Sequence, residues 1–334
     1  MMDILEPVNI IGLSQKFAEA LDLPLSAYFP RIGSPVPGAT VTYDVVTYSR
    51  DIAELNTRDG APNPVAQVKR GTVTLRAPSI AEQVTIPAHT VANLRAPGEL
   101  AQKNGEQWVA RNIQNLTRRL ERRIELLRAQ ALGADPTRPG CLRFREPGLE
   151  EDTVVELGYR DDHLQLHTAD WSDPDADIIG DIEAGIAKIA EDGGKVADTL
   201  IVGSRVMSYL RQNAGVQALL TDAERAQLLL GTGLLRLVDT NVRVVRGVYD
   251  DNGTLRPFIP ENGVILLAGD NSDRMLIECS PTSLHAPEGT RGLFVHRIDG
   301  EGLRDGITIQ YEWTGCPVVM NPDEIIADGD VTSA

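Results

Sequence analysis

A long amphipathic helix constrains the fold of this 334-residue chain more than any other feature of its sequence. Apolar residues recur every three or four positions from Val109 to Ala131, which is the spacing of one face of an α-helix. Gly133 follows this run and favours helix termination, because glycine readily adopts the left-handed conformation at a helix C-terminus. A helix over residues 100–132 would span about 50 Å, so it can support elements on both of its sides.

The other face of this predicted helix carries like charges one turn apart, and such pairs destabilise an isolated helix by a few tenths of a kcal/mol each. The pairs are Arg118 with Arg122, Arg119 with Arg123, and Glu121 with Glu125. Two interpretations are open. The face is either a solvated charged surface, or a surface on which acidic groups of another segment or subunit dock.

A long β-hairpin is predicted before the helix. Residues 40–49 alternate β-branched or aromatic residues with polar ones, and a second strand pattern covers residues 68–77 and resumes at 83–87. A strand of ten residues reaches about 33 Å, which is further than a compact domain needs. Because both strands are half polar, we expect a neighbouring subunit to cover their exposed edges.

The rest of the chain predicts an α+β fold. Residues 1–38 combine a short helix with a segment rich in proline and glycine, which is typical of an arm that lies on another element. Residues 140–169 have the pattern of three antiparallel strands, the last at 163–169. A helix is predicted at 178–194, and alternating strands and short helices follow.

The search for a catalytic, cofactor or metal site gives no candidate. The sequence has no phosphate-binding loop, no HExxH or GxSxG motif, and three cysteines without a CxxC spacing. His163 and His167 would lie about 13 Å apart along a strand, too far for one metal ion. A cluster of four aspartates resembles a calcium loop but lacks its glycine and its final glutamate. The cluster consists of Asp170, Asp173, Asp175 and Asp177. We therefore interpret them as a turn and the start of a helix, and predict that the protein is not an enzyme.

The charge and hydropathy of the chain exclude further classes of function. The formal net charge is −16, and an acidic chain lacks the clustered cations that grip nucleic acid. It could still enclose nucleic acid without gripping it. No stretch of the sequence is apolar enough for a membrane span, and the N-terminus lacks the pattern of a signal peptide. We therefore expect no membrane partner, and a protein that stays in the cytoplasm of the cell that makes it.

The order of these elements resembles the major capsid proteins of tailed phages, which have the Hong Kong 97 type of fold. The sequence is similar to the lambda-like major head protein family, also called phage capsid protein E, in particular. The stretches that carry the resemblance are 118–133, 154–186, 198–220, 258–269 and 305–331.

This resemblance implies a division of the chain into four parts. Residues 1–38 would be the N-terminal arm, and 39–90 the extended loop, a β-hairpin that reaches over a neighbouring subunit. Residues 91–170 and 302–334 would form the peripheral domain with a spine helix at 100–132. Residues 171–301 would form the axial domain, which meets its copies around the fivefold and sixfold axes.

The resemblance also implies a function. Hexamers and pentamers of the chain would assemble into an icosahedral shell around a double-stranded DNA genome, in the host cytoplasm, and would remain in the virion. Scaffolding, portal and decoration proteins would be its partners, and no cofactor is implied. The predicted interface residues are the arginines of the spine helix and polar groups of the hairpin, namely Arg118, Arg119, Arg122, Arg123, Glu54, Asp59 and Lys69.

Some phages of this fold join a loop lysine to a neighbour's asparagine, for which Lys69 and Asn321 would be the candidates. Lambda-like heads are generally not cross-linked, so we expect no covalent bond here.

Three alternatives remain open at this stage. An encapsulin-type nanocompartment shell shares the fold, although encapsulins are generally shorter. A metal-dependent hydrolase would use the aspartates at 170–177 and would be a monomer or small oligomer. A tail or baseplate protein would form rings or tubes instead of closed shells.

Overall fold

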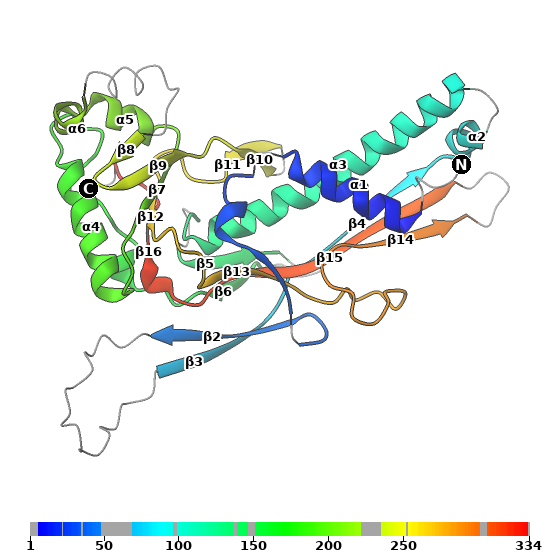
Figure 1. Ribbon diagram of the computed structural model, residues 1–334, viewed down its shortest axis with the longest axis horizontal. Coiled ribbons are helices and arrows are strands. Elements are labelled where there is room, and N and C mark those ends of the chain that lie inside the picture. The colour runs from blue at the N-terminus through cyan, green and yellow to red at the C-terminus, as the bar shows by residue number, and fades with distance from the viewer. Residues whose placement is uncertain are drawn as a thin grey trace, which may run out of the picture.

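The computed structural model describes residues 6–21, 23–34, 36–47, 69–95, 99–135, 139–145, 151–221, 235–251, 253–300 and 306–332. Its longest helix is α3 (Glu99–Ala131), which runs diagonally through the molecule in Figure 1. Val109, Ile113 and Ile124 on its apolar face are fully buried. The helix predicted at 100–132 is therefore present, and Gly133 follows it with a φ of 83°.

A five-stranded sheet packs against α3 and is built around β15 (Ile307–Val319). The first part of β15 lies between β4 (Ser79–Ile86) and β14 (Phe294–Asp299), and its last part pairs with β13 (Arg274–Glu278). These pairings are antiparallel, and β1 (Arg31–Gly33) adds to β13 in parallel. The sheet thus extends from β1 of the arm at one end to β4 and β14, beside the N-terminal half of α3, at the other.

Two short helices flank this sheet and α3. α1 (Pro7–Glu19) packs against both α3 and β14, and starts with a proline, whose missing N–H costs nothing in the first turn. η2 (Ser26–Tyr28) follows on the arm, and α2 (Ala88–Arg95) packs against α3. The residues before the hairpin therefore lie along the body of the molecule, as an arm would.

A second five-stranded sheet lies at the other end of the molecule (Figure 1). Its strands, in order, are β16 (Ile325–Asp328), β12 (Val264–Leu267), β7 (Thr199–Val202), β9 (Thr240–Val244) and β8 (Leu235–Leu237). Every residue of β16, β12 and β7 is buried. Three helices share their apolar core with this sheet: α4 (Ile178–Asp192), α5 (Val206–Gln212) and α6 (Ala214–Leu219).

Three two-stranded hairpins complete the described part of the fold. They are β2 (Thr40–Thr47) with β3 (Lys69–Arg76), β5 (Cys141–Phe144) with β6 (Thr153–Glu156), and β10 (Val248–Asp251) with β11 (Thr254–Pro257). Figure 1 shows that the β2–β3 hairpin projects away from the rest of the molecule. Its buried residues Val41, Tyr43 and Leu75 belong to the main apolar core, and Val45 and Val73 pack against that core.

Two predictions about strands are wrong. Residues 83–87 were expected to extend the hairpin, but β4 leaves it and pairs along its whole length with β15. Residues 163–169 were expected to form a strand, but η3 (Asp161–His163) and irregular backbone occupy this segment. The N–H groups of Leu166 and His167 donate to the side chain of Asp328 instead of to a strand partner.

Two connections that join the sheets lie side by side. Residues 268–273 lead from β12 to β13, and residues 320–324, which include η4 (Pro322–Glu324), lead from β15 to β16. The N–H of Met320 donates to the carbonyl of Asp273 at 2.8 Å. A domain boundary was expected between residues 301 and 302. Both sheets cross it: β13 and β14, which precede it, pair with β15, and β16, which follows it, pairs with β12.

None of the helices in the described ranges is long and apolar enough to span a membrane.

Candidate assembly interface

The arginines predicted to form an interface lie on the C-terminal half of α3. Arg118, Arg122 and Arg123 are exposed, and no ion pair involves any of them within the part of the chain that the structure describes. Arg119 differs, because it binds Glu82 of β4 in the same subunit, with 2.6 Å between Nη2 and Oε1. This ion pair raises the pKa of Arg119. Since both side chains contact solvent, the pair contributes only about 0–1 kcal/mol to stability.

The hairpin residues predicted to meet these arginines are largely outside the structure. Glu54 and Asp59 lie outside the described residues. Lys69 is the first residue of β3, and its backbone pairs with Thr47. The contact between the hairpin tip and the arginine face therefore stays a prediction.

The polar face of the projecting hairpin is a ladder of hydroxyl groups. Thr42 lies opposite Thr74 with 3.3 Å between their oxygens, and Thr72 donates to Asp44 at 2.9 Å. On the apolar face, Val45 and Val73 remain partly exposed beyond the buried base. Hydrogen-bonded pairs directly opposite each other stabilise a two-stranded ribbon that has no further strand partner in the described chain.

The glutamates on α3 have a role that the sequence analysis missed. Glu121 and Glu125 were included in a charged outer face, but both are buried. Both carboxylate oxygens of Glu121 accept from Nη2 of Arg31 at 2.7 Å. Glu125 accepts from the N–H of Leu25 at 2.8 Å and from Arg128 at 3.0 Å. These carboxylates hold the N-terminal arm of the same subunit on the spine helix.

Burial governs the protonation of this arm site. Removal from water raises the pKa of Glu125, although the Leu25 N–H and Arg128 oppose the shift. Burial likewise lowers the pKa of Arg128.

The sequence did contain a signal for the burial of these glutamates. Glu121 and Glu125 directly follow Leu120 and Ile124 of the apolar face, so they lie at its border.

Other contacts fix the arm along its length. The hydroxyl groups of Ser14 and Tyr311 lie 2.8 Å apart and join α1 to β15. Asn271 donates to the carbonyl of Ala27 at 2.9 Å, and Arg31 also binds Glu278 at 3.1 Å. The arm therefore contacts α3, the sheet and the β12–β13 connection.

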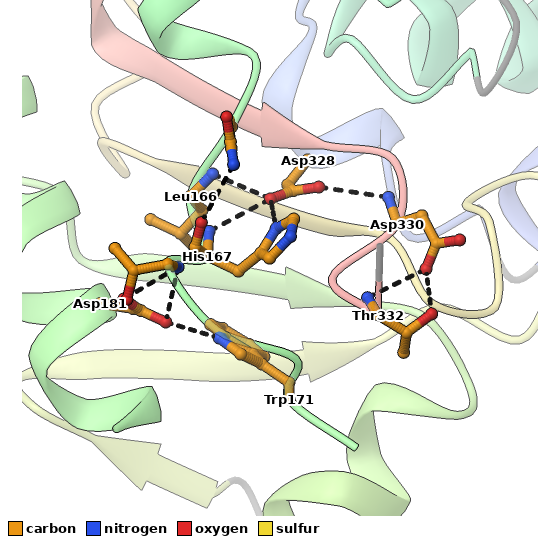
Figure 2. A network of polar contacts seen from close by, with 9 residues as sticks. Leu166, His167, Trp171, Asp181, Asp328, Asp330 and Thr332 are labelled. Carbon is orange, nitrogen blue, oxygen red and sulfur yellow. Dashed lines mark hydrogen bonds and ion pairs between the residues drawn. The ribbon is translucent and has the colours of Figure 1, made fainter. Parts of the chain in front are cut away.

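Figure 2 shows how buried carboxylates fix the segment at residues 163–171 between α4 and β16. One oxygen of Asp328 accepts from the N–H groups of Leu166 and His167 and from Nδ1 of His167, the last at 2.6 Å. Asp181 of α4 accepts from the indole N–H of Trp171 at 2.7 Å. Of the residues that were weighed as metal ligands from the sequence, His167 is engaged by these bonds.

The histidines and aspartates that were weighed as metal ligands lie apart from one another. His163 contacts Asp192 at 3.1 Å, whereas His167 contacts Asp328. Asp177 accepts from the N–H of Gly180 and caps α4, as interpreted from the sequence. No group of three or more His, Cys, Asp or Glu side chains that could hold a metal ion occurs in the described ranges.

Asn321, the candidate acceptor for a cross-link, is engaged inside its own subunit. Its side chain is 3% exposed and donates to Glu324 at 2.9 Å and to the carbonyl of Gly193 at 3.3 Å. An amide held in this way is not presented to a neighbouring chain.

The chain is similar in fold to several solved structures over nearly its whole length. A prophage protein of Escherichia coli CFT073 that is assigned as its capsid protein has a TM-score of 0.67 at 15% identity, over 97% of this chain and 98% of its own. A phage-related protein of Bordetella bronchiseptica RB50 has a TM-score of 0.57 at 14% identity, over 96% and 97%. The SrpI encapsulin of Synechococcus elongatus PCC 7942 is less similar, with a TM-score of 0.51 at 12% identity, over 94% and 89%.

The fold is therefore that of the Hong Kong 97-type phage capsid subunits. The profile of the phage major capsid protein E family matches residues 22–327, and the chain belongs to that family. No curated protein sequence matches it significantly. The chain is a structural protein that forms the shell of a phage virion, and the encapsulin alternative has weaker support.

Proposed function

We propose that the chain assembles as hexamers and pentamers into a closed icosahedral shell around the double-stranded DNA of a tailed phage. Each β2–β3 hairpin reaches over a neighbouring subunit. There the acidic residues Glu54 and Asp59 meet the arginine face of the neighbour's spine helix, which is formed by Arg118, Arg122 and Arg123. Lys69 lies at the same contact.

The observation that carries this proposal is the contrast between the two sides of α3. The buried glutamates on one side are satisfied by the arm of the same subunit. The exposed arginines on the other side, Arg119 excepted, have no counter-charge in the described chain. A hairpin that projects away from the body, in a chain of net charge −16, supplies acidic groups that can reach a second copy.

The division of labour within the shell is also part of the proposal. Residues 1–38 act as the arm, 39–90 as the extended loop, 91–170 with 302–334 as the peripheral domain, and 171–301 as the axial domain. Sheet pairing supports moving β4, β13 and β14 to the peripheral unit and β16 to the axial one. Assembly takes place in the host cytoplasm with a scaffolding protein, and portal and decoration proteins join the shell.

Charge reversal tests the interface. Arg122→Glu is expected to abolish closed particles in negative-stain electron microscopy while leaving a folded subunit, because two acidic surfaces then repel each other. Combining it with Glu54→Arg is expected to restore particles. Arg246→Glu, an equal change at another exposed arginine, serves as the control.

Normal particles from Arg122→Glu would overturn the arginine contact. A purified wild-type chain that never closes into particles, alone or with its assembly partners, would overturn the shell proposal as a whole.

A further inference from the structure

A partly buried cluster of charges lies where the two connections between the sheets meet the end of α4. Nζ of Lys195, just after α4, lies 2.6 Å from Asp273 and 2.8 Å from Glu324. Asp273 belongs to the β12–β13 connection and Glu324 to the β15–β16 connection. Asp270 completes the group at 3.3 Å from the same Nζ. One lysine thus joins three carboxylates from both connections.

The backbone at this junction is closely packed. The N–H of Met320 donates to the carbonyl of Asp273, and the N–H of Ala268 donates to the carbonyl of Glu324. A Cβ atom added to Gly193 would lie 2.7 Å from the carbonyl oxygen of Asp323. The charges therefore lie at a point that sets the relative position of the two sheets.

Two carboxylates share one lysine at the junction. The groups that face Glu324 are Lys195, Asp273, Asp270 and the buried Arg274. The side chain of Asp270 is 60% exposed, whereas those of Asp273 and Glu324 are 9% and 0% exposed and both contact Nζ of Lys195. Two tyrosines, Tyr28 of the arm and Tyr159, also lie close to Arg274. Because two buried carboxylates repel each other when both are ionised, a proton on one of them stabilises the pair.

The surroundings of Glu324 disfavour its ionised form. Glu324 is 0% exposed, and its Oε1 accepts from Lys195 and from the amide of Asn321. Its Oε2 is buried and accepts no hydrogen bond. A buried carboxylate oxygen without a donor is not solvated, so ionisation of Glu324 is costly at this position.

We propose that Lys195, Asp273 and Glu324 form a proton-dependent clamp on the hinge between the two sheets. With a proton on Glu324 the clamp is closed, and the loss of this proton places two buried negative charges side by side, which loosens both connections. In the shell, where its effect rests on the proposed function, the clamp controls how easily the two parts of each subunit change their relative position. The clamp itself is a property of the single subunit.

The ionisation of the cluster supports this proposal. Burial raises the pKa of Glu324 to about 7, and a hydrogen bond to Asp273 adds to the shift. The pKa of Asp273 is lowered, because hydrogen bonds from Glu324 and Lys195 outweigh its own burial. A group whose folded pKa is raised stabilises the closed state fully below its unfolded pKa of 4.5, and this stability is lost as the pH rises through about 7.

Hydrogen exchange of the unassembled full-length chain tests the clamp. After correction for the intrinsic exchange rate, the amides of Ala268 and Met320 are expected to lose about tenfold in protection between pH 6 and pH 8. Glu324→Gln keeps a neutral side chain at all these pH values, so its protection should not change. Glu183→Gln removes the same charge from the exposed side of α4 and should behave like the wild type.

Equal protection at pH 6 and pH 8 in the wild type, or an unchanged tenfold loss in Glu324→Gln, would overturn the clamp. If Glu324→Gln does not fold, carboxyl ¹³C NMR of the wild type decides the question. One glutamate that titrates near pH 7 supports the clamp, and its absence contradicts it. Because these measurements use the single subunit, failure to form shells would overturn the proposed function and leave the clamp result intact.

Discussion

At the residue scale, buried carboxylates with fixed partners do most of the positioning. Glu125 and Glu121 attach the arm to the spine helix, and Asp328 and Asp181 attach the segment at 163–171 to its neighbours. Each of these carboxylates accepts two or more hydrogen bonds. Such groups specify one geometry, because a buried charge that loses a partner is costly.

Replacing Glu125 by leucine is expected to destabilise the subunit by about 3–5 kcal/mol. The substitution leaves Arg128, which is 1% exposed, without its ion-pair partner, and leaves the N–H of Leu25 without an acceptor. Urea denaturation measures the change in the free energy of unfolding. The control is Arg122→Ala on the exposed face of the same helix, which should change this free energy by less than about 0.5 kcal/mol. Equal effects of the two substitutions would contradict the assigned role of Glu125.

Two buried tyrosines predict how the protein responds to alkali. Burial raises the pKa of Tyr43 and of Tyr311 to about 12, against 10.0 for an unperturbed tyrosine. The folded state holds these protons more tightly than the unfolded state, so stability is lost as the pH rises from 10 toward 12. In a titration followed by tyrosinate absorbance, these two residues and Tyr159, whose pKa burial also raises, should ionise last or together with unfolding. Removing one of them, as in Tyr311→Phe, should reduce this late step, and a late step of unchanged size would contradict the assignment.

At the element scale, the end of α3 depends on a glycine for two separate reasons. Gly133 has a φ of 83°, a conformation that side chains with a Cβ rarely adopt. A Cβ atom at this position would also lie 2.5 Å from the Cβ of Ala327, which immediately precedes Asp328 on β16. The helix therefore stops where β16 passes close to its backbone.

Gly133→Ala is expected to destabilise the subunit by about 2 kcal/mol or more, because it adds this steric overlap to the cost of the left-handed conformation. Gly194 isolates the cost of the left-handed conformation, since its φ is 73° but no atom lies within 4 Å of an added Cβ. Gly194→Ala should therefore cost only about 1 kcal/mol. Thermal unfolding of both variants measures the difference, and equal losses would show that the contact with Ala327 does not contribute.

At the scale of the whole molecule, the hairpin is separable from the rest of the fold. All the described residues of β2–β3 that lie in or pack against the main apolar core are outside residues 48–68, namely Val41, Tyr43, Val45, Val73 and Leu75. Replacing residues 48–68 by an Asn-Gly turn between β2 and β3 should therefore leave the thermal stability of the subunit nearly unchanged. The same change should abolish closed particles in electron microscopy, because the hairpin no longer reaches a neighbour.

A second replacement of residues 48–68 by a glycine-serine segment of equal length separates reach from side-chain contact. Loss of particles in both variants indicates that the side chains of the tip are required. Recovery with the longer segment indicates that reach alone is sufficient. Normal particles from the short-turn variant would contradict the role of the hairpin in assembly.

Elements that carry their own periodicity could be predicted from the sequence. Local spacing predicted the α3 helix and its end near Gly133, a helix in the arm, and the β2–β3 pair. It also placed Asp177 at the start of α4. The family resemblance followed from the order of these elements, and the family profile confirms it.

The pairing of elements far apart in the chain was decided only by the tertiary structure. β4 looks like a continuation of the hairpin, but β15, more than 200 residues later, offers a full-length partner. Residues 163–169 alternate like a strand, but Asp328 and Asp181 accept from the backbone N–H groups of residues 166–168 instead. Glu121 and Glu125 look like solvated charges until the arm covers them. Local patterns determine which conformations a segment favours, whereas its hydrogen-bond partners and its burial depend on segments that only the folded chain brings into contact.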